Sequence, residues 1–260
     1  MRLLTYSALA FAAACALAAP TAAQTYGGAS SSDLLGYRSS AGHYYNRSLG
    51  SKVRSNASRR RASTRPRTQP RPTGTKPGTT TVPTRPTSSA SPIPGPTTFT
   101  PVAPMVAPQA LAARVPTDKK QTEDFYASLL GSYRDLVREK GAPENDVARA
   151  ASFAVSVSYS IYNDGRFLTP QQIDGLRAQM REVFSEDEEF QRLSDRDKQE
   201  LYESYAIIGM YISSVYDGAR KANHQKGIAQ MRHLAQTQLE ETFGVPVGQL
   251  DFTDDGVKYK

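Results

Sequence analysis

The sequence has little of several residue types on which common active sites depend. It contains one cysteine, three histidines and no tryptophan in 260 residues. The cysteine, Cys15, lies near the start, so a chain that loses its first 23 residues has no disulfide, thiolate metal site or cysteine nucleophile. There is also no G-x-S-x-G elbow, P-loop or dinucleotide glycine fingerprint. These absences exclude the commonest serine hydrolases and nucleotide-dependent enzymes.

Long hydrophobic runs are also scarce after the N-terminus. The longest charge-free stretches with helical character are Ala150–Asn163 and Ser204–Tyr216, of 14 and 13 residues. A transmembrane helix needs about 20 apolar residues, so we expect no membrane span in the mature chain. Both stretches instead predict buried helices that pack against each other as a central pair. Close approach would be permitted by Ala150, Ala151, Ala154 and Gly209.

The first 23 residues have the layout of a secretory signal peptide. Arg2 precedes a short apolar run over Ala8–Ala19, and Thr21-Ala22-Ala23 supplies the small residues of a cleavage site. We therefore expect export to the periplasm or the cell exterior, with Gln24 as the mature start. Alternatively, Ala12-Ala13-Ala14-Cys15 resembles a lipobox, which would make Cys15 the lipid-modified first residue of a lipoprotein. Export without disulfides is typical of a bacterial envelope protein.

Acidic residues are almost missing from residues 24–115. This segment contains 13 Lys and Arg and a single acidic residue, Asp33. Twelve prolines lie between Pro66 and Pro108. Such a stretch cannot bury enough apolar surface to offset its conformational entropy, so it predicts a disordered, basic, Pro-rich tether. Its charge would hold an anionic lipid or polymer, or would simply keep a solvated spacer extended. The candidate polyanion contacts are Arg59, Arg60, Arg61, Arg65, Arg67 and Arg71.

Residues 116–260 carry 18 Lys and Arg against 24 Asp and Glu, and they show helical periodicity. The excess of acid disfavours a uniformly basic nucleic-acid-binding domain. A first helix ends at Lys140-Gly141, and a second runs from about Pro143–Asp146 to Asn163. The apolar stripes of these two helices are Phe125, Leu129, Tyr133 and Leu136, then Val147, Ala151, Ala154, Val157 and Ile161.

Capping residues mark the later helices. Thr169, Pro170 and Gln172 form a capping box with proline at the first helical position, and Ser194 with Asp197 caps the longest helix. We also expect a short turn at Glu188–Leu193, a last helix from about Lys226 to Phe243 ended by Gly244, and an irregular segment over Val245–Gly256. Together these features predict an all-α domain, a compact bundle of five to six helices over residues 116–260.

A metal or cofactor site is not indicated. Asn163–Pro170 resembles half of an EF-hand loop, but Ser160, Tyr162 and Gln171 stand where calcium needs carboxylates. A glycine-terminated helix followed by a capped one explains the same residues. His224 and His233 lie nine residues apart and point to different helix faces, so they predict surface histidines and no metal pair.

Catalytic residues are not indicated either. The runs Glu186–Glu189 and Asp254-Asp255, with Asp251, lie in polar segments, whereas a catalytic acid needs apolar surroundings. The carboxylates at Glu123, Glu182, Glu200 and Glu203 occupy ordinary helix positions.

The tyrosines are more informative, because tyrosine favours interfaces. Tyr202, Tyr205 and Tyr216 are the candidate partner surface, bordering a groove between helices. The alternative places these rings at the rim of the bundle core.

The order of caps and helices resembles a known group of sequences. It is carried by Leu168–Gln172, Phe190–Gln199, Phe243-Gly244 and Leu250–Gly256. Over roughly the last 140 residues, the chain resembles an uncharacterised family of exported bacterial proteins with a C-terminal helical domain of unknown function. The resemblance implies an exported, helical bacterial protein and carries over no active residue.

The sequence therefore favours an exported, non-enzymatic envelope protein with a helical interaction domain on a cationic tether. The sequence does not decide whether the chain is an enzyme, although the absence of a catalytic signature favours a protein that is not one. The alternatives are a cell-wall glycan hydrolase and a tail-driven binder of lipopolysaccharide or nucleic acid.

Overall fold

The predicted amphipathic stripes fold as helices in the computed structural model, which describes residues 97–114 and 118–260. These residues form seven α-helices, one 3₁₀ turn and a two-stranded hairpin, which confirms the all-α fold class. The helices are α5 (Ala107–Ala112), α6 (Lys119–Glu139), α7 (Val147–Tyr162), α8 (Pro170–Glu186), α9 (Glu188–Arg192), α10 (Asp195–Lys221) and α11 (Gln225–Phe243).

The predicted helix boundaries are confirmed by the caps that the structure contains. Thr169 and Gln172 form the reciprocal bonds of a capping box at the start of α8, and Ser194 and Asp197 do the same for α10. Gly244 ends α11 with a left-handed φ of 68°, a conformation that glycine adopts without steric cost. The predicted turn at Glu188–Leu193 is a single helical turn, α9, capped by Asp187.

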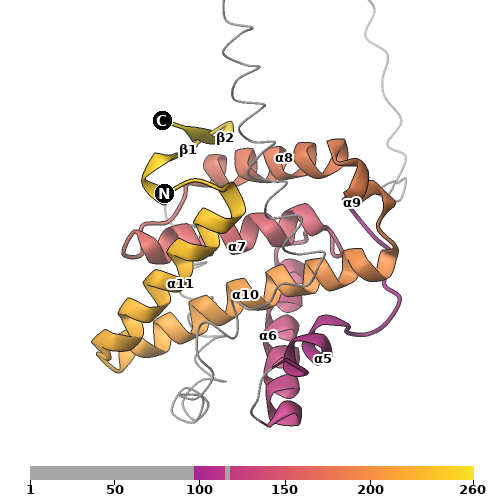
Figure 1. Ribbon diagram of the computed structural model, residues 1–260, viewed down its shortest axis with the longest axis horizontal. Helices are drawn as coiled ribbons and strands as arrows, with labels where there is room; N and C mark the ends of the chain where they lie inside the picture. The colour runs from indigo at the N-terminus through magenta and orange to yellow at the C-terminus, as the bar shows by residue number, and fades with distance from the viewer. Residues whose placement is uncertain (1–96, 115–117) are drawn as a thin grey trace, which may run out of the picture.

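The two charge-free stretches lie on α7 and α10, which cross the middle of the bundle and pack together (Figure 1). At Gly209 an added Cβ atom would lie 2.6 Å from Phe153 Cε1 and 3.2 Å from Ala154 Cα. The small residue therefore permits the close approach that the sequence predicted. Among the residues described, no helix is long and apolar enough to cross a membrane.

The remaining helices enclose this pair. In Figure 1, α8 lies along one side of α7. Helix α6 runs at a steep angle to α10, and α5 packs against α6. The larger core cluster includes Leu130, Leu176 and Phe243, each fully buried. A smaller cluster around Ile212 and Leu234 joins α10 to α11.

The C-terminal segment is not irregular as the sequence predicted, and this is a correction. After a 3₁₀ turn at Val247–Gln249, strands β1 (Leu250–Thr253) and β2 (Gly256–Tyr259) pair antiparallel, with Phe252 opposite Val257. Figure 1 shows the hairpin against α8. Apolar residues alternate with polar ones along β1, and Asp255-Gly256 gives a turn signal, so the pattern was present but short.

Residues 97–114 pack on the bundle, although the sequence placed them in the tether. Thr98 forms an isolated β-bridge with Asp146, and Phe99 and Leu111 are buried in the main core. Thr98 thus pairs with the start of α7, while α5 packs on α6 and α10. Local composition does not reveal such contacts, which involve residues on the N-terminal side of the predicted boundary at residue 116.

Candidate functional site

A groove opens where α7 ends against the side of α11. It has a volume of about 800 Å³ and a mixed lining in which polar side chains outnumber apolar ones. The lining residues are Tyr162, Asn163, Asp164, Arg166, Gln225, Ile228, Ala229, Arg232, His233 and Gln236. We refer to these residues as the α7–α11 groove.

The turn after α7 places the charged residues of the groove. Asn163 caps the helix, and its side-chain Nδ2 donates to Tyr159 O at 2.9 Å. Asp164 and Gly165 then take left-handed φ angles of 59° and 83°, and Gly165 N donates to Ser160 O at 2.7 Å. This reversal directs Asp164 and the following Arg166 toward α11.

Positive charge exceeds negative charge in the groove. Arg232 on α11 forms an ion pair with Asp164, whose side chain is largely exposed. The Nε of Arg232 is buried and has no hydrogen-bond partner in the part of the chain that the structure describes. Arg166 and His233 also line the groove. The groove therefore offers several donors to a ligand that carries acidic or hydroxyl groups.

An exposed aromatic ring lies in the same loop. Phe167 immediately follows Arg166 and is 75% exposed. No other large hydrophobic side chain among the described residues is as exposed. The next residue, Leu168, is buried in the core and fixes the loop from that side. An exposed aromatic beside hydrogen-bonding groups is typical of binding surfaces.

The EF-hand resemblance has a structural explanation. The residues Asn163–Pro170 end α7, make the turn and begin α8, as the alternative interpretation proposed. No group of three or more metal-ligating side chains occurs within residues 97–114 and 118–260. His224 caps α11, where its Nδ1 accepts from Gly227 N at 3.1 Å. His233 lies apart from it, in the α7–α11 groove.

One carboxylate that the sequence treated as an ordinary helix position is fully buried. Glu203 on α10 is 0% exposed. Its Oε2 accepts hydrogen bonds from the backbone N–H groups of Val106 at 2.6 Å and Ala107 at 2.8 Å, at the start of α5. No local pattern could identify these partners, because they lie almost 100 residues earlier in the chain.

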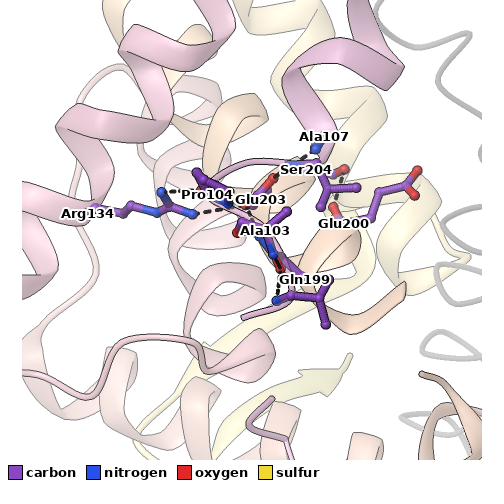
Figure 2. Close-up of polar contacts among 10 residues, drawn as sticks. Ala103, Pro104, Ala107, Arg134, Gln199, Glu200, Glu203 and Ser204 are labelled. Carbon is purple, nitrogen blue, oxygen red and sulfur yellow. Dashed lines mark hydrogen bonds and ion pairs between the residues drawn. The ribbon is translucent and has the colours of Figure 1, made fainter. Parts of the chain in front are cut away.

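The other oxygen of Glu203 is also occupied. Oε1 accepts from Arg134 at 2.9 Å and from Gln199 at 2.8 Å, as Figure 2 shows. Gln199 in turn accepts from Val102 N at 2.8 Å and donates to Ala103 O at 2.7 Å. We call Arg134, Gln199 and Glu203 the clasp. It holds residues 102–107 and leaves no free oxygen on Glu203 for acid catalysis.

The three tyrosines predicted to form a partner surface lie in the core. Tyr202, Tyr205 and Tyr216 are 1%, 5% and 4% exposed. The ring of Tyr202 packs against Phe99 with centroids 5.4 Å apart, so part of its cover comes from the segment assigned to the tether. The structure thus places these rings inside the bundle rather than on an exposed face.

The remaining predicted contacts, Arg59, Arg60, Arg61, Arg65, Arg67 and Arg71, lie outside the described residues. The predicted signal peptide and Cys15 lie outside them as well. Export and polyanion binding therefore stay predictions from the sequence.

Comparison with known proteins identifies a family for this chain but no individual relative. No curated protein and no solved structure matches it. Residues 4–260 match a family of unknown function, DUF6683, and this match extends well beyond the last 140 residues that carried the sequence resemblance. Because that match spans nearly the whole sequence, the chain belongs to the DUF6683 family.

Proposed function

We propose that this chain is an exported, non-enzymatic protein of the bacterial envelope whose helical domain binds an acidic envelope polymer through the α7–α11 groove. The observation that carries the proposal is the excess of positive charge in the groove, where Arg166 and Arg232 outnumber Asp164. The exposed ring of Phe167 follows Arg166 directly in the chain. Guanidinium groups bind carboxylate and phosphate groups with paired hydrogen bonds, and an aromatic ring packs on sugar rings. The basic segment before residue 97 would add attraction that salt weakens.

Binding is favoured over glycan hydrolysis by the chemistry of the same groove. A glycosidase needs two carboxyl groups on either side of the scissile bond, one of them a protonated acid. Asp164 is the one carboxylate that lines the groove, and it is paired with Arg232. Burial raises the pKa of Asp217, but Asp217 does not line the groove. The groove is therefore suited to holding a ligand rather than cleaving it.

Co-sedimentation of the full chain with isolated bacterial envelope fractions tests the proposal. The groove variant is Arg166→Gln with Arg232→Gln, and the tail variant replaces Arg59, Arg60 and Arg61 by Gln. We expect the tail variant to lose binding chiefly at low salt, where surface attraction between charges is weakly screened. We expect the groove variant to lose the binding that persists at high salt.

The matched control is Arg192→Gln, because Arg192 is 73% exposed on α9 and pairs with Glu188 there. It removes one positive charge, where the groove variant removes two, at a distance from the groove in sequence, and it should bind like the unmodified chain. If the groove variant sediments as well as this control at both salt concentrations, the groove does not bind the envelope. Turbidity clearing of purified peptidoglycan would contradict the non-enzymatic part of the proposal.

A further inference from the structure

A second cluster of basic side chains lies at the other end of α7. Arg149 belongs to the first turn of α7, while Arg177 and Arg181 lie one turn apart on α8, which packs against α7. The ring of Tyr133 on α6 packs against Phe153, four residues after Arg149, with centroids 4.9 Å apart. Three helices thus converge at this cluster, which contains none of the residues of the α7–α11 groove.

Several hydrogen-bond donors in the cluster have no partner within residues 97–114 and 118–260. Tyr133 is 1% exposed, and its hydroxyl is buried without a hydrogen bond. The Nε atoms of Arg149 and Arg177 are likewise buried and unpartnered. Buried polar groups in proteins are almost always bonded to protein, water or a ligand. All three of these groups can donate to an acceptor that enters from outside.

Negative charge in the cluster is already engaged. Asp146 accepts from Arg181 at 3.0 Å and also from Thr97 Oγ1 and Ala148 N. Arg177 donates to the exposed Asp174 at 3.1 Å.

Arg149 has no ion pair among the residues that the structure describes. Burial lowers the pKa of Arg149, and the charges of Arg177 and Arg181 lower it further, although Asp146 and Tyr133 act in the opposite direction. An anion bound here would offset this accumulation of positive charge.

We propose that Arg149, Arg177 and Arg181 form a binding site for a phosphate group, with the hydroxyl of Tyr133 as an additional donor beneath it. The guanidinium groups donate N–H bonds to phosphate oxygens, and no covalent step is involved. Phosphate suits the site better than a carboxylate does, because it offers more acceptor oxygens and up to two negative charges. The side chains of Arg177 and Arg181 are 25% and 47% exposed, which leaves the site reachable from solvent. The group would come from free phosphate or from a phosphomonoester.

Calorimetric titration of the full chain with inorganic phosphate, at constant ionic strength and pH, tests this site. We expect Arg149→Gln to weaken the binding attributable to the site about tenfold, as is usual for the loss of a charge-assisted hydrogen bond. Arg192→Gln is the control, because it removes an exposed arginine paired on its own helix. It should leave the titration unchanged. Titrations with glycerol phosphate and with acetate separate a phosphomonoester from free phosphate and from a carboxylate.

Two further variants keep the test decisive if Arg149→Gln folds poorly. Arg181→Gln alters a more exposed residue and should weaken phosphate binding severalfold. Tyr133→Phe removes a hydroxyl that has no partner, so we expect its melting temperature in chloride to match that of the unmodified chain while its phosphate affinity falls. The proposal is overturned if phosphate binds no better than chloride or acetate. It is also overturned if the folded Arg149, Arg181 and Tyr133 variants all titrate like Arg192→Gln.

Discussion

The carboxylate of Glu203 accepts a hydrogen bond of 2.8 Å from the backbone N–H of Ala107, across 96 residues of sequence. Ala107 is the first residue of α5, whose N-cap, Val106, provides no side-chain bond to the helix. The carboxylate on α10 therefore caps a helix that belongs to a different part of the chain. Through this bond and the rest of the clasp, the segment that leads into the N-terminal region is fixed to the centre of the bundle.

Replacing Glu203 by Ala should release that segment. The change leaves two buried backbone N–H groups and the guanidinium of Arg134 without their acceptor, and losing one partner of a buried charged pair commonly costs about 3 kcal/mol. We expect a fall of this size in the free energy of unfolding, measured by urea denaturation. Hydrogen exchange should also accelerate over residues 102–112.

The control for this variant is Glu241→Ala, because Glu241 is exposed on α11. A similar loss of stability in both variants would show that the clasp contributes nothing specific. Faster exchange throughout the chain, with no preference for residues 102–112, would show that the clasp does not act on that segment in particular.

The capping box of α8 is a local feature, and its removal should have a local cost. In Thr169→Ala the N–H of Gln172 loses its acceptor, a hydroxyl at 3.2 Å, which should reduce the free energy of unfolding by about 1 kcal/mol. Thr237→Ala is the opposite case, since Thr237 lies within α11 and alanine is the better helix former there. Chemical denaturation of both variants should give shifts of opposite sign. Equal shifts would count against the capping interpretation.

The capping box of α8 and the clasp differ in how far apart their residues lie in the sequence. This difference explains which parts of the fold could be predicted. Thr169 and Gln172 are three residues apart, so their pattern is visible in the sequence and the helix start was predicted correctly. Glu203 and Ala107 are joined only through the tertiary fold, so nothing near Glu203 indicates that it is buried. For the same reason the packing of residues 97–114 was missed.

The candidate site shows the same division. The turn at Asn163–Gly165 was recognised as a glycine stop, because the signal is local. The presence of Arg232 and His233 beside that turn depends on how α11 packs against α7, which periodicity does not specify. Tyr202 was predicted at a groove because tyrosine favours interfaces. The sequence did not show that the distant Phe99 packs against its ring.

Gly175 should be essential for docking the C-terminal hairpin. A Cβ atom there would lie 2.1 Å from Asp254 O, which is backbone and cannot move aside as a flexible side chain would. Alanine normally favours a helix over glycine by about 1 kcal/mol, yet the clash should make Gly175→Ala destabilising by about 1–3 kcal/mol. Thermal unfolding and the exchange rates of residues 250–259 would measure the effect.

Gly131→Ala provides the matched control, because Gly131 is also inside a helix and an added Cβ atom would meet nothing within 4 Å. This variant should be more stable than the unmodified chain by up to about 1 kcal/mol. If both glycine variants are stabilised, the hairpin does not press on α8 as closely as the structure indicates.

Asp217 should make stability depend on pH in the direction opposite to that of a salt-bridged acid. Burial raises its pKa above the ordinary value of 3.8, against a smaller lowering by Lys221 and Arg220. The folded chain therefore holds this proton more tightly than the unfolded chain does. The stability that comes from this group is fully present below the unfolded pKa and is lost as the pH rises through the folded pKa.

Asp217→Asn removes the charge that is poorly solvated at neutral pH. We expect the variant to be more stable than the unmodified chain at pH 7, by no more than about 0.5 kcal/mol because the group is partly exposed and solvent screens it. The advantage should shrink toward pH 3, where the unmodified carboxyl is protonated as well. Urea denaturation at several pH values measures the difference, with the exposed Asp251→Asn as control. A variant that is less stable at pH 7 would mean that attraction to Lys221 and Arg220 outweighs the desolvation of Asp217.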